Sequence, residues 1–389
     1  MADVLFYVQH LLGIGHLRRA AALVAAMDRT VLEVVLVSGG MPVKGLDIGG
    51  ARLVQLPPLR SRDTDFSALV DGDGKPIDEA WKAARRDRLL ALYRETRPRA
   101  IVTEQFPFGR RQLRFELMPL LEAATASEPR PTIIASIRDI LNEPGKPEKT
   151  AWILDTVRHH FDLVLVHGDP AFTTLEDSFP PAAGIAERVR YTGYVVAGAA
   201  EKGNGPEQGL GQGEVLVSTG GGAVAAPLVE AALAARERTP LKDATWRILI
   251  GDNLPQDQFE RFAEAAPNGV IVERSRSDFR ARLARCALSI SQAGYNTAME
   301  VLRAGVPAVL VPFVGSGETE QSLRARLLAE RGAAVALAEA DLTGGTLARA
   351  VAQALETRGR QPGVALATEG AARTAEIVRE RLAIVGISS

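Results

Sequence analysis

The stretch VLFYVQHLLGIGHLRRAAALVAAM, residues 4–27, holds an apolar run, a glycine-containing loop and an alanine-rich segment in direct succession. A short, continuously apolar run is typical of a strand that is covered on both faces. A strand that passes into a helix through a short loop is the building unit of parallel α/β sheets. A turn made only for packing needs the glycines but not His16, so we expect this loop to face a ligand.

The same alternation of apolar runs and helical patterns continues along the chain and predicts parallel sheets with right-handed crossovers. A polar, glycine-rich linker at residues 195–214 divides the pattern into two similar halves. We therefore predict an α/β protein with two doubly wound, Rossmann-like domains, residues 1–197 and 198–389, facing one another across a cleft. The expected strands are residues 3–8, 31–38, 51–56, 99–105, 132–139, 162–168, 188–193, 214–220, 246–251, 269–274, 288–294, 308–313 and 333–339.

Composition excludes several classes of protein. The 389 residues are 46% hydrophobic and 24% charged, which is typical of a globular protein, and the net charge of -1 argues against a nucleic-acid partner. No apolar run approaches the roughly 20 residues of a membrane span. The single cysteine, Cys286, precedes an apolar run and is expected to be a buried thiol in a reducing compartment. Because MADVLFYVQH lacks the basic region of a signal peptide, we expect a cytoplasmic protein.

Ligands of open α/β sheets bind beyond the carboxyl ends of the strands, so the loops there are the candidate sites. In VSTGGGAV, residues 217–224, Thr219, Gly220, Gly221 and Gly222 follow a strand. Glycines let a phosphate approach backbone N–H groups and a helix N-terminus. The alternative is a tight turn without a ligand.

A second candidate is SISQAGYNTAMEVLRAGVPAVLVPF, residues 289–313. A carboxylate such as Glu300 suits the paired hydroxyls of a ribose. The alternative is a capping box, T-x-x-E, in which Thr297 and Glu300 satisfy N–H groups at the start of a helix. In the next loop, VGSGETEQSLRA at 314–325, Glu320 and Gln321 either bind sugar hydroxyls or complement a helix dipole.

In the first half, His16 lies at the start of its helix, where it can act as base, acid or phosphate partner. Its alternative is a polar residue of the first helical turn. Glu104 and Asp139 follow other strands and are further candidates for the base, with surface ion pairs as the alternative. Candidates for contact with a phosphate or an anionic acceptor are Gly13, Gly15, Arg18, Arg110, Arg111 and Arg138.

Two acidic triplets and one basic helix have simpler interpretations. The D-x-D triplets at 63–65 and 71–73 lie in polar, glycine-containing sequence, so we interpret them as turns and expect no metal site. The basic segment 81–99 carries an apolar face that includes Trp81 and Leu89. We expect that face to pack in the core, with docking on an anionic membrane as the alternative.

The loops of the second half, taken together, resemble the GT-B glycosyltransferases of family 28. The resemblance rests on Ser291, Gly294, Thr297 and Glu300, then AGVPAVLVPF at 304–313, then Glu320-Gln321. Departures from the peptidoglycan-type members at 13–16 and 192–198 argue against a peptidoglycan acceptor. GIGHLRR at 13–19 also resembles the G-x-G-H-x-x-R signature of UDP-sugar hydrolases with the same fold.

The resemblance implies the GT-B fold and a role for each of these residues. Glu300 would bind the ribose, Gly220–Gly222 the diphosphate, Phe279 the base, and Glu320 and Gln321 the donor sugar. The nucleotide pocket would be lined by Ser291, Gln292, Gly294, Asn296 and Thr297.

The implied activity is inverting, metal-independent transfer from a UDP-sugar to a hydroxyl of a small molecule, lipid or polysaccharide precursor, with no further cofactor. A lipid acceptor would bring the protein to the inner face of the membrane. The alternatives are a UDP-sugar hydrolase and a non-catalytic nucleotide-sugar binding protein.

Overall fold

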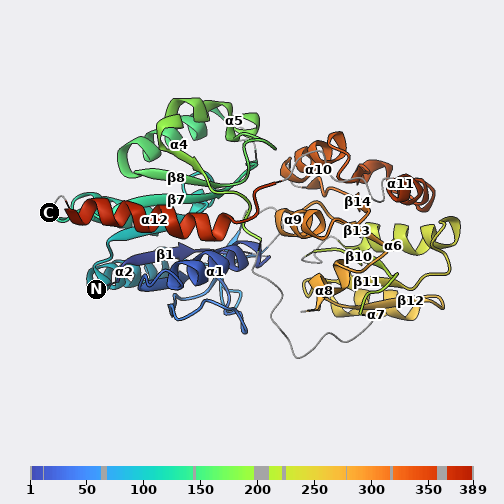
Figure 1. Ribbon diagram of the computed structural model, residues 1–389. Helices are drawn as coiled ribbons and strands as arrows, with labels where there is room; N and C mark the ends of the chain where they lie inside the picture. Colours follow the sequence, from blue (N-terminus) through green and yellow to red (C-terminus); the bar gives the residue numbers. More distant parts are fainter. Residues whose placement is uncertain are drawn as a thin grey trace. The chain divides into compact units, whose positions relative to one another are not determined.

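The computed structural model describes residues 2–11, 13–62, 68–142, 146–196, 210–220, 225–276, 278–315, 319–356 and 366–387. The chain forms two compact units (Figure 1). One comprises Met1–Ala197 together with Leu366–Ser389, and the other comprises Gly198–Ala365. Within the described ranges, none of the helices combines the length and the apolar character that crossing a membrane requires.

The first unit is built on a seven-stranded sheet with the order β3-β2-β1-β6-β7-β8-β9, in which every neighbouring pair is parallel. Its strands are β1 (Val4–Val8), β2 (Val34–Ser38), β3 (Arg52–Gln55), β6 (Ala100–Glu104), β7 (Thr132–Arg138), β8 (Leu163–His167) and β9 (Val189–Tyr191). An antiparallel hairpin of β4 (Leu59–Ser61) and β5 (Leu69–Asp71) was not predicted. The helices are α1 (Gly15–Asp28), α2 (Glu79–Thr96), η1 (Arg111–Leu113), α3 (Arg114–Thr125), α4 (Pro147–His160), α5 (Leu175–Ser178), η2 (Pro180–Arg188) and α12 (Gly370–Ile387).

Alternate side chains of β1 enter two separate cores, one on each face of the sheet. Leu5 and Tyr7 join a cluster that includes Leu89 of α2, Leu117 of α3 and Ile153 of α4. On the other face, the cluster contains Val4, Phe6, Val8, Leu17, Leu23, Ala375, Val378 and Leu382, from β1, α1 and α12. Because helices cover both faces, the strands are apolar throughout rather than alternating.

The second unit has a six-stranded parallel sheet with the order β12-β11-β10-β13-β14-β15. Its strands are β10 (Val215–Ser218), β11 (Trp246–Ile250), β12 (Val270–Arg274), β13 (Leu288–Ser291), β14 (Ala308–Leu310) and β15 (Val335–Ala336). The helices are α6 (Ala226–Ala235), η3 (Arg236–Arg238), α7 (Gln256–Glu264), α8 (Phe279–Leu283), α9 (Tyr295–Ala304), α10 (Glu320–Glu330), η5 (Glu339–Asp341) and α11 (Gly344–Glu356). The strands expected from the sequence are confirmed in both units, with ends that differ by a few residues.

The predicted second domain, 198–389, was wrong at its C-terminal end. Residues from Leu366 onward belong to the first unit, and α12 (red in Figure 1) packs against α1. Ala375, Val378 and Leu382 are at most 2% exposed in the core that they share with β1. The guanidinium of Arg99 also donates to the carbonyl of Leu382 at 2.7 Å. The sequence shows that this helix has an apolar face but not which core the face covers.

Candidate functional site

Each sheet has a point where the sequence order of its strands reverses, between β1 and β6 in the first unit and between β10 and β13 in the second. The connections on either side of such a point leave toward opposite faces of the sheet, which opens a crevice at the carboxyl ends of the strands. His16 lies in the first turn of α1, the helix that follows β1, and β6 ends at Glu104. The loops after β10 and β13 carry Gly220 and Gly294. The predicted site residues therefore gather at two switch points.

At the first switch point, His16 contacts Glu104 through the first turn of α1. The Nδ1 atom of His16 is 3.1 Å from Oε1 of Glu104. Arg19, one turn further along α1, forms an ion pair with the same oxygen. The Glu104 side chain is fully buried, whereas that of His16 is 15% exposed. The imidazole thus has a carboxylate on one side and access to solvent.

The charges around this pair fix its protonation state. Burial by itself would raise the pKa of Glu104, but Arg19 and His16 hold that pKa well below its usual range. Burial lowers the pKa of His16 to about 3, against the hydrogen bond to Glu104, which raises it. The neighbouring charges of Arg110 and Arg138 lower it as well. At neutral pH the pair is therefore a carboxylate beside a neutral imidazole.

The carboxylate of Glu104 is also held from the opposite side, by residues that the sequence analysis missed. The hydroxyl of Ser136 in β7 donates to Oε2 of Glu104 at 2.6 Å. Nε2 of His167, at the end of β8, lies 2.8 Å from the same hydroxyl, and Nδ1 of His167 lies 2.9 Å from Oγ1 of Thr192. Ser136 interrupts an apolar run in β7 and His167 ends the apolar run of β8, which is the signal by which the sequence could have identified them.

Asp139, a predicted candidate for the base, belongs to the structure instead. It is fully buried and accepts a hydrogen bond from the hydroxyl of Tyr194 at 3.0 Å. Its Cβ atom also lies close to Gly168, where a side chain on the glycine would collide with it. Asp139 is therefore not positioned to take a proton from a ligand.

The cationic candidates of the first unit differ in burial. Arg18 and Gly13 are exposed, Arg111 and Gly15 are half-buried, and so are Arg110 and Arg138. Burial and the charge of Arg138 together lower the pKa of Arg110 to about 10, so the two guanidinium groups lie near one another. The charges of both also lower the pKa of His16. Apart from the carboxylate of Glu104, the charges that act on the imidazole are therefore cationic.

At the second switch point, a glycine turn follows β10. Gly220 has the left-handed φ of 59°, and a Cβ atom there would lie 3.5 Å from Oε1 of Gln292 in the loop after β13. The two predicted loops therefore meet. Thr219 is fully buried, and its N–H and its hydroxyl both donate to the carbonyl of Leu249 in β11, at 3.1 and 3.4 Å. Gly221 and Gly222 lie outside the described residues.

The helix after β13 excludes the capping-box interpretation of Glu300. Helix α9 begins at Tyr295 with Gly294 as its N-cap, and no side chain caps it. Thr297 is then the third residue of the helix and Glu300 the sixth, which is too far along to bond the N-terminal N–H groups. Asn296 and Thr297 are half-buried in the first turn. Within the described ranges, the N-terminus of α9 thus has a glycine N-cap and no side-chain cap.

Glu300 instead pairs with α8. Its Oε1 atom accepts from Nε of Arg280 at 2.8 Å, and its side chain is 15% exposed. Phe279, the residue before Arg280, is half-buried at the start of α8. Glu300, which was predicted to bind the ribose, thus contacts α8. That helix also carries Phe279, which was predicted to contact the nucleotide base.

The structure does not present Glu320 to a ligand, contrary to the prediction that it binds the donor sugar. Its side chain is 1% exposed and lies 2.7 Å from Nη2 of Arg324, one turn along α10. Arg324 in turn donates to the carbonyl of Ala293 at 3.3 Å, so the pair supports the loop after β13. Gln321 is half-buried and accepts from the N–H of Phe313 at 3.2 Å. Ser291 is fully buried, and its hydroxyl has no partner among the described residues.

Two further expectations have a physical explanation in the structure. In the triplet 71–73, Oδ1 of Asp71 accepts from the N–H groups of Asp73 and Lys75, at 3.0 and 2.9 Å, so the triplet forms a turn. The triplet 63–65 lies outside the described residues. No group of three metal-ligating side chains occurs in the part of the chain that the structure describes. Burial raises the pKa of Cys286 to about 12, which keeps this thiol protonated.

The apolar face of the basic helix α2 is used within the first unit. Leu89, Leu92 and Tyr93 are buried in the core. Arg85, on the same helix, is fully buried and pairs with Glu116 at 2.8 Å. This confirms packing in the core and removes the apolar face that membrane docking would need.

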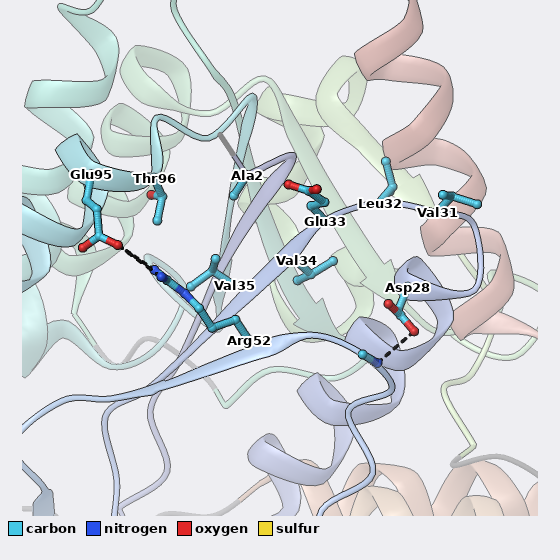
Figure 2. Close-up of a pocket in the computed structure, with 11 residues that line it drawn as sticks. Ala2, Asp28, Val31, Leu32, Glu33, Val34, Val35, Arg52, Glu95 and Thr96 are labelled. Carbon is cyan, nitrogen blue, oxygen red and sulfur yellow. Dashed lines mark hydrogen bonds and ion pairs between the residues drawn. The ribbon is translucent and has the colours of Figure 1, made fainter.

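The pocket in Figure 2 lies at the amino ends of strands in the first sheet, opposite the carboxyl ends that carry the candidate site. It has a volume of about 560 Å³ and is lined by the residues where β2 and β3 begin, Val34 and Arg52 among them. Arg52 and Glu95 form an ion pair at 3.1 Å along it. None of the predicted site residues lines this pocket, because they follow the carboxyl ends of the strands.

Comparison with known proteins agrees with this organisation. Residues 215–377 match the glycosyltransferase family 28 C-terminal domain. The UDP-N-acetylglucosamine--N-acetylmuramyl-(pentapeptide) pyrophosphoryl-undecaprenol N-acetylglucosamine transferase of Anaeromyxobacter sp. (strain K) is 38% identical over 90 residues, 23% of this chain and 24% of the relative. The match thus spans about a quarter of the length of that relative.

Solved structures match over nearly the whole chain. The calicheamicin glycosyltransferase CalG4 has a TM-score of 0.62 at 16% identity, over 99% of this chain and 98% of its own. The spinosyn rhamnosyltransferase SpnG, complexed with thymidine diphosphate, has a TM-score of 0.61 at 17% identity, over 99% of this chain and 96% of its own. Together with the two Rossmann-like units, these matches establish that the chain has the GT-B fold, and residues 215–377 match the glycosyltransferase family 28 C-terminal domain.

Proposed function

We propose that the protein transfers a sugar from a UDP-sugar to an acceptor hydroxyl, with inversion at the anomeric carbon and without a metal ion. The observation that carries the proposal is the contact between His16 and Glu104 at the first switch point. A carboxylate that orients an imidazole is the arrangement by which many enzymes convert a hydroxyl into a nucleophile. The family 28 domain at residues 215–377 supports a nucleotide-sugar donor for the second unit.

The proposed reaction is a single displacement. The acceptor hydroxyl gives its proton to Nε2 of His16 while its oxygen attacks the anomeric carbon from the face opposite the diphosphate. The new bond to the acceptor oxygen forms as the bond to the phosphate oxygen breaks, and the electron pair of that bond leaves with the diphosphate. Attack from the opposite face inverts the configuration. Glu104 stabilises the imidazolium that results.

We assign the donor to the second switch point. The uncapped N-terminus of α9 and the turn at Gly220 offer backbone N–H groups and a helix dipole to the diphosphate. Glu300 would accept hydrogen bonds from the ribose hydroxyls, Phe279 would contact the base, and Gln321 the sugar. The names of the relatives support a nucleoside diphosphate, since one includes UDP-N-acetylglucosamine and one structure contains thymidine diphosphate.

The test measures UDP release from a panel of UDP-sugars, with and without panels of small-molecule, lipid-linked and saccharide acceptors. We expect release that depends on an acceptor and a glycoside of inverted configuration, detected by NMR of the anomeric proton. The His16→Ala variant should remove the release while the UDP affinity, measured by calorimetry, is retained. Tight UDP binding without turnover on any panel would contradict the transferase assignment.

A second candidate, hydrolysis of the UDP-sugar, is favoured by one feature of the site. The imidazole of His16 is able to activate water as readily as a sugar or lipid hydroxyl, because nothing in the contact with Glu104 distinguishes the two. Free sugar produced in equal amount to UDP, in the absence of acceptor, would identify the protein as a hydrolase.

A further inference from the structure

A continuous chain of hydrogen-bonding side chains crosses the carboxyl edge of the first sheet. It runs from Thr192 after β9 to His167 of β8, to Ser136 of β7 and to Glu104 of β6, with contacts of 2.9, 2.8 and 2.6 Å. All of these side chains are buried, and those of Ser136 and His167 are fully so. The strands are consecutive neighbours in the sheet, so each contact bridges one pair of strands.

The direction of each proton in this chain follows from the charge on Glu104. A carboxylate has no proton to give, so the hydroxyl hydrogen of Ser136 must point to Glu104. The oxygen of Ser136 then accepts from His167, which therefore carries its proton on Nε2. The bare Nδ1 of His167 then accepts from the hydroxyl of Thr192 at 2.9 Å, in competition with the carbonyl of Gly193, which lies 3.0 Å from the same hydroxyl. Every donor in the chain points toward the carboxylate.

At the other end, the remaining oxygen of Glu104 has His16 and Arg19 as partners. A proton on Nδ1 of His16 satisfies the 3.1 Å contact with Oε1 of Glu104. In the other tautomer, Nδ1 would accept from Arg19, 3.2 Å away, but its lone pair would then face an anion. We expect the first arrangement, because it replaces that repulsion with a charge-assisted hydrogen bond.

We propose that Ser136, His167 and Thr192 are positioning residues that hold Glu104 in one orientation and thereby fix the proton of His16 on Nδ1, leaving Nε2 basic. The assignment of the tautomers stands on the contacts alone, and its consequence for turnover rests on the proposed function. The two buried histidines should carry their protons on opposite ring nitrogens.

A purely structural role does not explain why the sheet contains this chain. The residues that flank Ser136 in β7 are Ala135 and Ile137, and Val166 precedes His167 in β8. Apolar side chains at the two positions would pack without a desolvation penalty, whereas buried polar groups are stable only when each hydrogen bond is made. Burial lowers the pKa of His167 to about 3, so it stays neutral and keeps its role as a donor through Nε2 at all ordinary pH values.

The experiment is long-range ¹H–¹⁵N NMR of the ring nitrogens in the full chain labelled with ¹⁵N-histidine. The chain has 5 histidines, so their signals can be assigned by single substitutions. We expect His167 to be protonated on Nε2 and His16 on Nδ1. A proton on Nδ1 of His167, or on Nε2 of His16, would overturn the inference.

Matched variants test whether the chain acts on His16. Ser136→Ala removes the donor to Glu104, and Ser136→Thr keeps it. His167→Leu removes the donor to Ser136, and His167→Gln keeps one. We expect a mixture of His16 tautomers in the first member of each pair and a single tautomer in the second. An unchanged His16 tautomer in Ser136→Ala and His167→Leu, with both variants folded by circular dichroism, would overturn the inference.

Turnover of UDP-sugar supplies the second measurement. Ser136→Ala and His167→Leu should lower kcat by roughly tenfold or more while KM changes little, and the conservative variants should recover most of it. If the tautomers behave as expected but His16→Ala leaves turnover unchanged, the proposed base is wrong and the hydrogen-bond chain stands. If the His16 tautomer is unchanged in Ser136→Ala and His167→Leu while His16→Ala abolishes turnover, the proposed base stands and the role of the hydrogen-bond chain is wrong.

Discussion

The two switch points of the molecule are formed by different chemical groups. At the first, charged and polar side chains are buried against one another, from Arg19 and His16 to His167. At the second, the crevice is formed by a left-handed glycine, Gly220, and by the N-terminus of α9, where no side chain forms a cap. The same fold therefore offers one edge of fixed side chains and one edge of backbone N–H groups.

This difference corresponds to the two tasks in the proposed reaction. Proton transfer needs one nitrogen with a defined tautomer, and a surrounding network supplies it by leaving few alternative arrangements. Binding of a diphosphate needs several weak donors at close range, which glycine and a helix N-terminus supply without a side chain. Substitutions at the first switch point should therefore act on turnover and stability, and those at the second on affinity.

The largest expected effect is on turnover. His16→Ala should lower kcat by about 10²–10⁴-fold, because the acceptor loses its base, while the affinity for UDP changes little. His159→Ala, an exposed histidine on α4, is the matched control. Steady-state kinetics with calorimetric binding of UDP measures both quantities, and a near-normal kcat in His16→Ala would assign this residue to the structure alone.

Neutralising the carboxylate should damage stability as well as turnover. Glu104→Gln leaves the buried guanidinium of Arg19 without its ion pair, and we expect a loss of about 3 kcal/mol in the free energy of unfolding. Urea denaturation followed by circular dichroism measures it, with the exposed Glu122→Gln on α3 as control. Equal stability of the two variants would show that the negative charge of Glu104 does not stabilise the buried guanidinium of Arg19.

Acid should destabilise the first unit through its buried histidines. The pKa values of His10, His16 and His167 are about 4, 3 and 3 in the folded chain, below the ordinary 6.5. The unfolded chain then binds more protons between pH 6.5 and those values, so the free energy of unfolding falls as the pH is lowered through this window. The fall is at most about 1.4 kcal/mol per pH unit for each histidine.

This dependence is measured by urea denaturation at a series of pH values between about 7 and 5. His167→Gln removes one of the titrating groups, so its stability should depend less steeply on pH. A slope identical to that of the unsubstituted protein would mean that His167 is not held neutral by the fold.

The smallest effect is expected at the second switch point. Glu300→Ala should raise the Kd for UDP about tenfold or more, roughly 1.4 kcal/mol, by removing the ribose contact. The unfolding free energy should change little, since the pair with Arg280 is partly exposed. The exposed Glu264→Ala on α7 is the control in calorimetry. Unchanged affinity would remove Glu300 from the site.

The sequence predicted the parts of the molecule that follow local rules. Apolar runs identified the strands of both sheets, and the loops after β1, β10 and β13 were correctly placed beyond the carboxyl ends of strands. Polar residues that are far apart in the chain and meet across a sheet, such as Ser136 and His167, were missed because no spacing connects them.

The wrong assignments have one physical cause: the type of a residue does not show whether its side chain is buried. Glu320 and Asp139 have the chemistry of ligand-binding carboxylates, but the fold encloses both with partners of their own. The T-x-x-E pattern predicted a cap at Thr297, three residues after Gly294, which is the N-cap of α9 in the structure. The burial of a carboxylate in a candidate loop must therefore be known before a ligand-binding role is assigned to it.

The return of α12 to the first unit governs how the protein can be divided. A fragment that stops at residue 197 would leave the apolar surface of α1 and β1 open where Ala375, Val378 and Leu382 pack. Exchanging the second unit between homologous proteins would therefore have to replace only residues 198–365 and retain the terminal helix of the recipient. The second unit is thus, for protein engineering, an insertion within the first unit rather than a separate C-terminal domain.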